Sequence, residues 1–419
     1  MSTHHQIVII GGGTAGIMTA AQLLRKDKNL DIAIIEPAEF HYYQPAWTLV
    51  GAGTYDYEKT KRPMSSVIPK GSSWIRDYAT TFSPEKNTVS TKESGDISYD
   101  YLIVAPGLVM DNSLIEGLQE AFDAGLACSN YTDPKYVWEQ LKKFKGGNAV
   151  FTQPATPIKC GGAPQKTAYM SSDYLRKQGL LDKTNVVFAT PGSVIFGVKP
   201  IRETLEKVID KYGIHFKPFY APHKIDVAKK EIIFKRVGQG EKPQVDPNNI
   251  LSEKQLDEQL VSMPFDFLHL APPQTAPKFI KDSVLANDAG WLEVDQFTLQ
   301  HKRFDNIFGL GDAAGLPTAK TGAAIRKQVP VVVDRVLRLL NKQQESQKSY
   351  NGYSSCPLVT GYGKMVLAEF DYDGNFIPDP KLKQMLVFDS AKEHWRLWML
   401  KKYGLPYLYW NKMMRGAEV

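Results

Sequence analysis

A glycine-rich turn near the start of the chain constrains the fold more than any other feature. Four β-prone apolar residues, 7–10, run directly into Gly11, Gly13 and Gly16 at G-x-G-x-x-G spacing, and a stretch rich in small residues follows. In such a turn the first glycine allows a tight bend, the second lets the backbone approach a pyrophosphate, and the third lets helix and strand pack closely. The unpaired amides and the positive end of the helix dipole hold the phosphates. The pattern predicts a dinucleotide site.

A second apolar strand follows and ends in Glu36, where a carboxylate is expected to meet the ribose hydroxyls of the nucleotide. The alternative is a glycine-rich turn without a ligand. It is disfavoured because strand, turn, helix and carboxylate come in the order that a Rossmann-like unit requires. The chain is therefore expected to be an α/β protein.

Composition narrows the class of protein further. At 419 residues the chain should hold two or three domains, and its net charge of +6 is too small to argue for a nucleic acid partner. We find no zinc-ligand spacing and expect no metal site. No stretch approaches eighteen apolar residues, so no membrane-spanning helix is expected. The first strand begins at Ile7, which leaves no room for a signal peptide and predicts a cytoplasmic protein or a processed form.

Residues 97–107, ISYDYLIVAPG, end at Gly107 and match the second signature of flavoproteins with two dinucleotide-binding domains. In that signature a strand returns beneath the flavin, and the residue before the glycine is usually Thr, whereas Pro106 stands here. Two motifs in the right order favour FAD over NAD at the first site.

A second α/β unit is expected from about Asn112, and it lacks a second G-x-G-x-x-G. Its first strand leads into a proline-rich loop that contains a cysteine. Its next strand is followed only by Pro191 and Gly192. The second nucleotide pocket is therefore expected to be unused, which argues against NAD(P)H as the electron donor.

Residues 304–328 supply a third flavin signature, in which a strand leads to Gly309-x-Gly311-Asp312. Asp312 is expected on the ribityl chain or pyrophosphate. A helix starting near Thr321 would point its positive end at the flavin pyrimidine and stabilise the anionic reduced ring. Lys320 would add a full charge there, or it is a solvated loop lysine.

The C-terminal tail is rich in aromatic and basic residues. Gly404 and Pro406 are expected to break it into two short helices, with Lys401 and Lys402 among the basic residues between the aromatic side chains. This mixture is typical of a helix that lies in the plane of a membrane surface. The alternatives are a helix packed on its own core and a dimer interface. The side chains expected at the membrane are Trp395, Trp398, Tyr403, Tyr409 and Trp410.

Two of the three cysteines lie in contexts that suggest chemistry. Cys160 sits in a Gly/Pro loop between a strand and a helix, with Lys159 beside it and Lys166 in the helix. Cationic neighbours and a helix N-terminus lower a thiol pKa, so Cys160 is placed to be a thiolate. Cys356 is expected in a turn. Two cysteines so far apart are more often inert than paired, and the residues alone leave both possibilities open.

The whole pattern resembles the sulfide:quinone oxidoreductases, in the branch that includes the mitochondrial enzymes. The two cysteine segments are specific to that family, because other flavoprotein disulfide reductases place both cysteines on one helix. The matching stretches cover the chain from end to end: HYYQPAWTLVGAG, TPIKCGGAPQK, GDAAGLPTAKT, YSSCPLVTGY and LPYLYWNKMMRG.

The resemblance implies that Cys160 and Cys356 are a catalytic redox pair. Relatives often have a cysteine where Ala313 stands, so no role is expected there. Some relatives tether FAD through a cysteine in the region of Cys128. The branch resembled here binds FAD non-covalently, so Cys128 is interpreted as a structural thiol.

The implied reaction is oxidation of hydrogen sulfide with transfer of two electrons through FAD to a membrane quinone. Cys356 would carry the persulfide and Cys160 would leave as a thiolate, while Lys166 would favour anionic substrates. Sulfite, a thiol, cyanide or sulfide would accept the sulfane sulfur. The protein would sit on a lipid bilayer surface, at the cytoplasmic face of a bacterial inner membrane or at the mitochondrial inner membrane if processed. Homo-oligomerisation is left open.

The expected architecture has a discontinuous FAD-binding Rossmann-like domain, a second Rossmann-like domain and a C-terminal membrane-interface segment with amphipathic helices. The expected bounds are 1–115 and 263–340 for the FAD domain, 116–262 for the second domain and 341–419 for the C-terminal region.

Three other functions remain as alternatives. An NADH:quinone oxidoreductase would need the missing glycine fingerprint, and a flavocytochrome-type sulfide dehydrogenase would be exported. A non-catalytic FAD-binding polysulfide sensor would show no quinone reduction.

Overall fold

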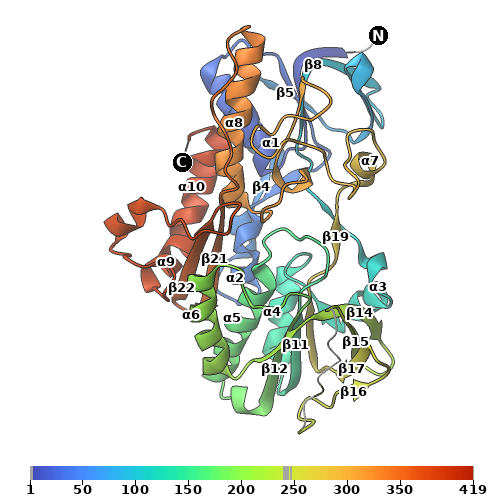
Figure 1. Cartoon of the computed structure of the whole chain (residues 1–419), viewed down its shortest axis with the longest axis vertical. Coiled ribbons are helices and arrows are strands. Elements are labelled where there is room, and N and C mark those ends of the chain that lie inside the picture. Colours follow the sequence, from blue (N-terminus) through green and yellow to red (C-terminus); the bar gives the residue numbers. More distant parts are fainter. Residues whose placement is uncertain (1–2, 239–244, 246–247, 419) are drawn as a thin grey trace.

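The computed structural model describes residues 3–238, 245 and 248–418, and its largest sheet is built around the first strand (Figure 1). β1 (Thr3–Ile10) pairs in parallel with β2 (Ile32–Ile35) and with β8 (Asp96–Val104). β20 (Ile307–Gly309) also pairs with β8, so a strand from late in the chain completes a sheet that starts at its beginning. The other strands of this sheet are β5 (Ser72–Ile75), β6 (Ala79–Ser83) and β7 (Thr88–Thr91).

Two long helices cover one face of this sheet and pack on each other (Figure 1). α1 (Thr14–Lys26) buries Ile17 and α8 (Gly322–Leu340) buries Val332, both completely, in one core with Ile7 and Ile9 of β1. The hydroxyl of Thr321 caps α8 by accepting a hydrogen bond from the amide of Ala324 (3.1 Å), which confirms the predicted helix start.

The second sheet is fully parallel and occupies the lower half of Figure 1, with the order β10-β18-β11-β12-β13. Its strands are β10 (Ala127–Cys128), β18 (Phe267–Leu270), β11 (Gly147–Thr152), β12 (Thr184–Thr190) and β13 (His215–Pro218). The helices beside it are α4 (Pro134–Lys143), α5 (Ala163–Lys177) and α6 (Lys199–Tyr212). Their apolar faces and the strands share one core.

The position of β18 corrects the predicted domain boundary at residue 263. β18 lies between β10 and β11, so the chain returns to the first sheet only after Leu270. A buried strand with four apolar or aromatic positions is recognisable from its sequence, but its pairing partner is not, because several parallel strands of this chain share that pattern.

Smaller elements complete the two lobes of the protein, which are the first lobe around the sheet of β1 and the second lobe around the sheet of β11. An antiparallel sheet beside the second lobe contains β14 (Tyr220–Asp226), β15 (Glu231–Arg236), β17 (Leu260–Pro264) and β16 (Lys254–Gln255). Two short strand pairs are β3 (Phe40–Tyr42) with β4 (Lys61–Pro63), and β9 (Val109–Met110) with β19 (Gln274–Thr275). Short helices are α2 (Trp47–Val50), α3 (Leu118–Asp123) and α7 (Lys278–Lys281).

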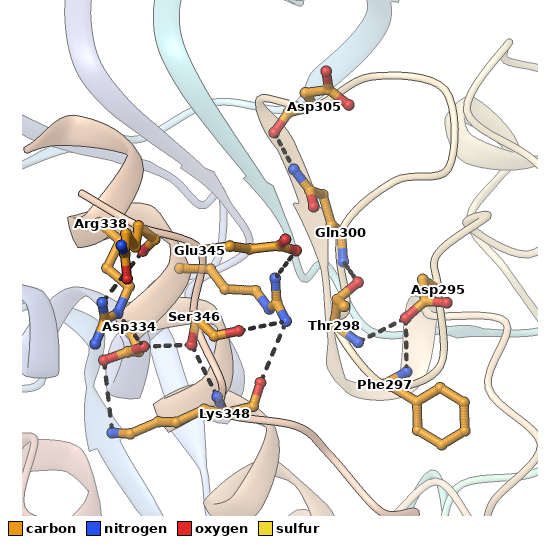
Figure 2. Close-up of polar contacts among 12 residues, drawn as sticks. Asp295, Phe297, Thr298, Gln300, Asp305, Asp334, Arg338, Glu345, Ser346 and Lys348 are labelled. Atoms are coloured by element: carbon orange, nitrogen blue, oxygen red, sulfur yellow. Dashed lines mark hydrogen bonds and ion pairs between the residues drawn. The ribbon is translucent and has the colours of Figure 1, made fainter. Parts of the chain in front are cut away.

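The polar segment that follows α8 is bound back to that helix. The hydroxyl of Ser346 donates to Asp334, and Nε of Arg338 donates to the same carboxylate at 2.9 Å (Figure 2). The guanidinium of Arg335 donates to the carbonyls of Ser346 (3.3 Å) and Lys348 (3.4 Å). These contacts direct the chain back toward the lobe interface, where the hairpin of β21 (Ser354–Gly361) and β22 (Lys364–Phe370) begins.

The C-terminal helix is continuous, which corrects the predicted break. α9 (Trp395–Met399) leads through a wider π-helical turn (Leu400–Gly404) into α10 (Leu405–Asn411). Gly404 has helical dihedral angles, and Pro406 lies in the first turn of α10 directly after the wider turn, where its missing N–H is tolerated.

Only part of the predicted membrane surface is exposed. Trp395 and Tyr403 are 58% and 57% exposed, whereas Trp398, Tyr409 and Trp410 are buried. The prediction is wrong for these three because one face of the helix packs on the protein core, and Tyr409 and Trp410 join the core of the first lobe. Among the described residues no helix is long and apolar enough to span a membrane.

Candidate active site

The glycine-rich turn between β1 and α1 is shaped by close backbone contacts. Gly11 has a φ of +99°, and a Cβ there would lie 2.4 Å from the carbonyl oxygen of Ala105. A Cβ on Gly16 would lie 1.9 Å from the carbonyl oxygen of Gly11, so only glycine lets α1 pack on the turn. Gly13 has no heavy atom within 4 Å of a built Cβ. The turn therefore leaves open space at the start of α1.

The N-terminus of α1 has no side-chain cap, and its first turn contains no acidic residue. Its first amides are thus available to an anion. Glu36 lies beside this turn, where Oε2 accepts a hydrogen bond from the amide of Gly12 (2.6 Å) and Oε1 accepts one from the amide of Ala38 (2.7 Å). Burial raises the pKa of Glu36, and the two amides oppose that rise. Its contact with a ribose stays a prediction.

The other predicted nucleotide residues lie near the carboxyl ends of the same sheet. Gly107 follows β8 with a φ of +77° and open space around a built Cβ. Asp312 follows β20 and is half-buried. Nζ of Lys320 donates to the carbonyls of Asp312 (2.8 Å) and Ala314 (2.9 Å), and burial lowers its pKa to about 8. Lys320 therefore holds the Asp312 turn, and its role toward a flavin stays a prediction.

The Cys160 loop bridges the two lobes. Cys160 has a φ of +52°, and its amide donates to the carbonyl of Lys320 at 2.7 Å. The hydroxyl of Tyr131 donates to the carbonyl of Cys160 at 3.2 Å. A left-handed residue that is not glycine is costly, and these two bonds hold it in place. The loop is thus attached directly to the segment that carries Lys320.

Cys356 approaches this loop from the hairpin. It lies within β21 rather than in the predicted turn, because the strand already begins at Ser354 and pairs with β22. Its Sγ lies 4.0 Å from Sγ of Cys160. A Cβ on Gly162 would lie 2.5 Å from Sγ of Cys356, so this glycine makes room for the sulfur. The structure brings together two thiols that the sequence separates by 196 positions.

The two thiols have opposite pKa shifts. The hydrogen bond from Cys356 lowers the pKa of Cys160, and Lys166, whose Nζ lies 3.0 Å from Sγ of Cys160, lowers it further. The same hydrogen bond and burial raise the pKa of Cys356. These directions, together with the ammonium of Lys166 beside Cys160, favour Cys160 as the thiolate of the pair. Burial of Lys166 opposes its charge, but the adjacent sulfurs outweigh burial and raise its pKa.

Several known proteins are similar to this chain over almost its whole length. Residues 5–330 match the pyridine nucleotide-disulphide oxidoreductase family. The chain is 40% identical over 99% of its length to the mitochondrial sulfide:quinone oxidoreductase of Mus musculus, and it covers 87% of that protein. The chain belongs to the mitochondrial-type sulfide:quinone oxidoreductases.

Two further sulfide:quinone oxidoreductases are similar. The mitochondrial enzyme of Dictyostelium discoideum is 39% identical over 98% of this chain and 86% of its own length. The X-ray structure of the enzyme from Aquifex aeolicus has the same fold, with a TM-score of 0.75, 20% identity, and coverage of 99% of this chain and 92% of that chain.

Membership of this flavoprotein family implies FAD, and the residues present fit it. The open space beside Gly13 and the uncapped start of α1 suit a pyrophosphate. Gly107 leaves space at the end of β8, and the Cys160 loop lies against the Lys320 segment. The cysteine pair thus faces the part of the first lobe that carries the later flavin motif.

One charged residue of this sulfide:quinone oxidoreductase was missed by the sequence interpretation. Lys401 was expected on the charged face of the tail, but it is buried, and its Nζ donates to the carbonyl of Pro45 at 2.7 Å. Burial and the charge of Lys166 lower its pKa to about 7, while the two sulfurs oppose this shift. Its spacing of four from Leu397 and from Leu405 could have placed it on the apolar stripe.

Cys128 lies on neither the Cys160 loop nor the Cys356 hairpin. It is buried in β10, where its Sγ lies 3.4 Å from the carbonyl oxygen of Leu268, and burial raises its pKa. A protonated thiol inside a sheet is unreactive, in keeping with its interpretation as a structural residue.

Proposed function

We propose that the chain oxidises hydrogen sulfide at Cys160 and Cys356 and passes two electrons through FAD to a membrane quinone. The observation that carries the proposal is the pair of sulfurs 4.0 Å apart, with the ammonium of Lys166 at 3.0 Å from Cys160. The similar proteins from Mus musculus and Dictyostelium discoideum are named for the same reaction.

In the oxidised protein, the two cysteines form a disulfide, with or without added sulfur. Hydrosulfide attacks the sulfur of Cys356, the bond to Cys160 breaks, and Cys356 becomes a persulfide while Cys160 leaves as a thiolate. The ammonium of Lys166, 3.0 Å from Sγ of Cys160, stabilises the departing thiolate and makes Cys160 the better leaving group.

A second nucleophile removes the outer sulfur. Sulfite, a thiol, cyanide or sulfide takes the sulfane sulfur and leaves Cys356 as a thiolate. Re-forming the bond between the two thiolates then releases two electrons. FAD, when bound, supplies the two-electron acceptor that links this step to reduction of the quinone. Lys166 places a positive charge near the sulfurs and favours anionic substrates.

The proposed cofactor residues hold FAD without a covalent bond. The glycines, carboxylates and lysine that we assign to it are Gly11, Gly13, Gly16, Glu36, Gly107, Asp312 and Lys320. The buried position of Cys128 supports non-covalent binding, because this thiol lies within the second sheet.

The exposed apolar face of the C-terminal region supports docking to the surface of a bilayer, such as the bacterial or mitochondrial inner membrane. Trp395 and Tyr403 extend outward from the C-terminal helix, and Phe388 is 77% exposed on the loop before it. Leu382 and Val387 of that loop share a core with Leu397 and Trp398 of α9, so the two elements present one continuous surface. Docking there would bring a lipid-soluble quinone to the protein.

A flotation assay with lipid vesicles tests the docking surface. Phe388→Ser and Trp395→Ser should each weaken vesicle binding about three- to tenfold, since each removes a large apolar group from the interface. Val109→Ser changes an exposed apolar side chain of β9 and serves as the control. Equal loss in all three variants would contradict this surface.

The function itself is tested by anaerobic absorbance spectra of the purified protein. Sulfide should bleach the flavin band and produce a long-wavelength charge-transfer shoulder, and a short-chain quinone should reverse both changes. A flavin that ignores sulfide but is bleached by NADH would overturn the proposal and favour a nicotinamide-dependent quinone reductase.

A further inference from the structure

A buried hydrogen-bonded chain connects the C-terminal helix to the glycine-rich turn. His41 on β3 places Nδ1 3.0 Å from the carbonyl oxygen of Gly12 and Nε2 2.5 Å from the hydroxyl of Tyr409 on α10. That hydroxyl also lies 2.8 Å from Oγ1 of Thr14, the first residue of α1. All of these groups belong to the first lobe, outside the cysteine pair.

The direction of each bond in this chain is determined. The carbonyl of Gly12 only accepts, so the proton of His41 must lie on Nδ1. Burial lowers the pKa of His41 to about 4, which keeps the ring neutral near pH 7 and leaves Nε2 as an acceptor. Tyr409 therefore donates to His41, and Thr14 donates to the oxygen of Tyr409.

The bond to Gly12 controls the amide that follows it. The carbonyl of Gly12 and the N–H of Gly13 belong to one planar trans peptide, so they point in opposite directions. Holding that carbonyl against His41 aims the N–H of Gly13 away from the imidazole. The amide of Gly12 is held separately by Glu36 at 2.6 Å. The amide and the carbonyl of Gly12 are thus held by the side chains of Glu36 and His41.

Aromatic contacts keep the hydroxyl of Tyr409 in place. Its ring centroid lies 4.6 Å from that of Tyr43 and 4.9 Å from that of Trp410. Trp410 in turn packs edge-on against His41, with centroids 5.7 Å apart. The C-terminal helix therefore cannot shift without disturbing the imidazole.

We propose that His41 and Tyr409 are positioning residues for FAD, which hold the glycine-rich turn in its phosphate-binding shape from the C-terminal helix. This inference rests on the proposed cofactor. The C-terminal helix then has a second role besides its outward face, because it sets how firmly the dinucleotide is retained.

The test measures FAD release from the purified holoprotein, followed as the rise in FAD fluorescence after dilution, well below the unfolding temperature of each variant. Tyr409→Phe keeps the ring and removes the donor, and it should release FAD about five- to tenfold faster. Tyr136→Phe is the matched control, because its hydroxyl donates to the carbonyl of Gly125 at 2.9 Å in the other lobe. It should release FAD at the rate of the unmodified protein.

Substitutions of His41 separate positioning from simple packing. His41→Asn keeps a donor toward Gly12 and should resemble Tyr409→Phe, whereas His41→Leu removes the donor and should release FAD faster than either. Combining Tyr409→Phe with His41→Leu should add little to His41→Leu alone, because both changes interrupt one chain.

Two results would overturn the inference: equal release from Tyr409→Phe and Tyr136→Phe, or fully additive effects of the two substitutions. An unmodified protein that purifies without FAD and binds none would instead overturn the proposed cofactor.

Discussion

Each of the two lobes contains a strand–turn–helix unit, and the two units differ in what occupies the space at the start of the helix. In the first lobe β1 leads into α1, and in the second β11 leads into α5. Each helix begins after a glycine, Gly13 or Gly162, and neither has a side-chain cap. A built Cβ on Gly13 meets nothing within 4 Å, whereas one on Gly162 lies 2.5 Å from Sγ of Cys356.

This difference explains why one unit is suited to a nucleotide and the other to sulfur. The space at the start of α1 is open to a phosphate, but the equivalent space at the start of α5 contains a sulfur atom from the hairpin. A helix N-terminus stabilises either an anionic phosphate or a thiolate. The fold of the unit is thus compatible with both chemistries, and the hairpin selects between them.

The largest effect is expected from replacing Cys356, whose sulfur fills the space at the start of α5. Cys356→Ser should lower sulfide-dependent quinone reduction by at least about a thousandfold, because no persulfide can form on an alcohol. FAD content, measured by absorbance, should stay unchanged. A variant that keeps a tenth of the activity would show that this sulfur is not the reaction centre.

The second-largest effect is expected on FAD binding at the strand–turn–helix unit of the first lobe. Gly16→Ala forces a Cβ to within 1.9 Å of the carbonyl oxygen of Gly11, which displaces α1 from the turn. FAD affinity, measured by titration, should fall about ten- to a hundredfold. Gly197→Ala is the control, since a Cβ there meets nothing within 4 Å. If FAD bound equally to both variants, the open turn would not be its site.

The electrostatics of the second unit are tested through the pH dependence of Cys160. Lys166 lowers the pKa of Cys160, so Lys166→Met should raise it. The midpoint for alkylation of the reduced protein by iodoacetamide should move up by about 1 to 2 pH units. At pH 7, reduction of the disulfide by sulfide should slow about tenfold, because the Cys160 thiolate then leaves less readily.

Lys177→Met provides the control for that experiment. Lys177 lies on the same helix, but its ammonium is half-exposed and lies 3.8 Å from the carboxylate of Asp173. Its removal should leave the alkylation midpoint in place. A midpoint that is also unchanged in Lys166→Met would contradict the thiolate assignment.

The smallest effect is expected at the third thiol. Cys128 lies in β10 of the second sheet, and a serine hydroxyl can keep the bond to the carbonyl of Leu268. Cys128→Ser should leave FAD content and turnover unchanged and lower the melting temperature by a few degrees, about 1 kcal/mol of stability. Loss of bound FAD would show that Cys128 in the second lobe contributes to FAD binding, which would contradict the assignment of FAD to the first lobe alone.

Sequence patterns predicted those features that depend on neighbouring residues. The turn at Gly11 needs a positive φ and a close backbone approach, and the cap at Thr321 needs a hydroxyl before a helix. Both requirements are met within a few residues of the chain, so they leave a readable signature. The sequence also shows that the second α/β unit lacks a G-x-G-x-x-G turn.

Only the tertiary structure decided which distant groups meet. Cys160 and Cys356 approach because the hairpin packs on α5, and Lys401 points inward because the opposite face of its helix is the exposed one. Packing of the C-terminal helix on the first lobe buries Tyr409 and Trp410, although the aromatic pattern alone predicted that they contact a membrane. Which face of an amphipathic helix is covered depends on long-range contacts, and those contacts have no local sequence signature.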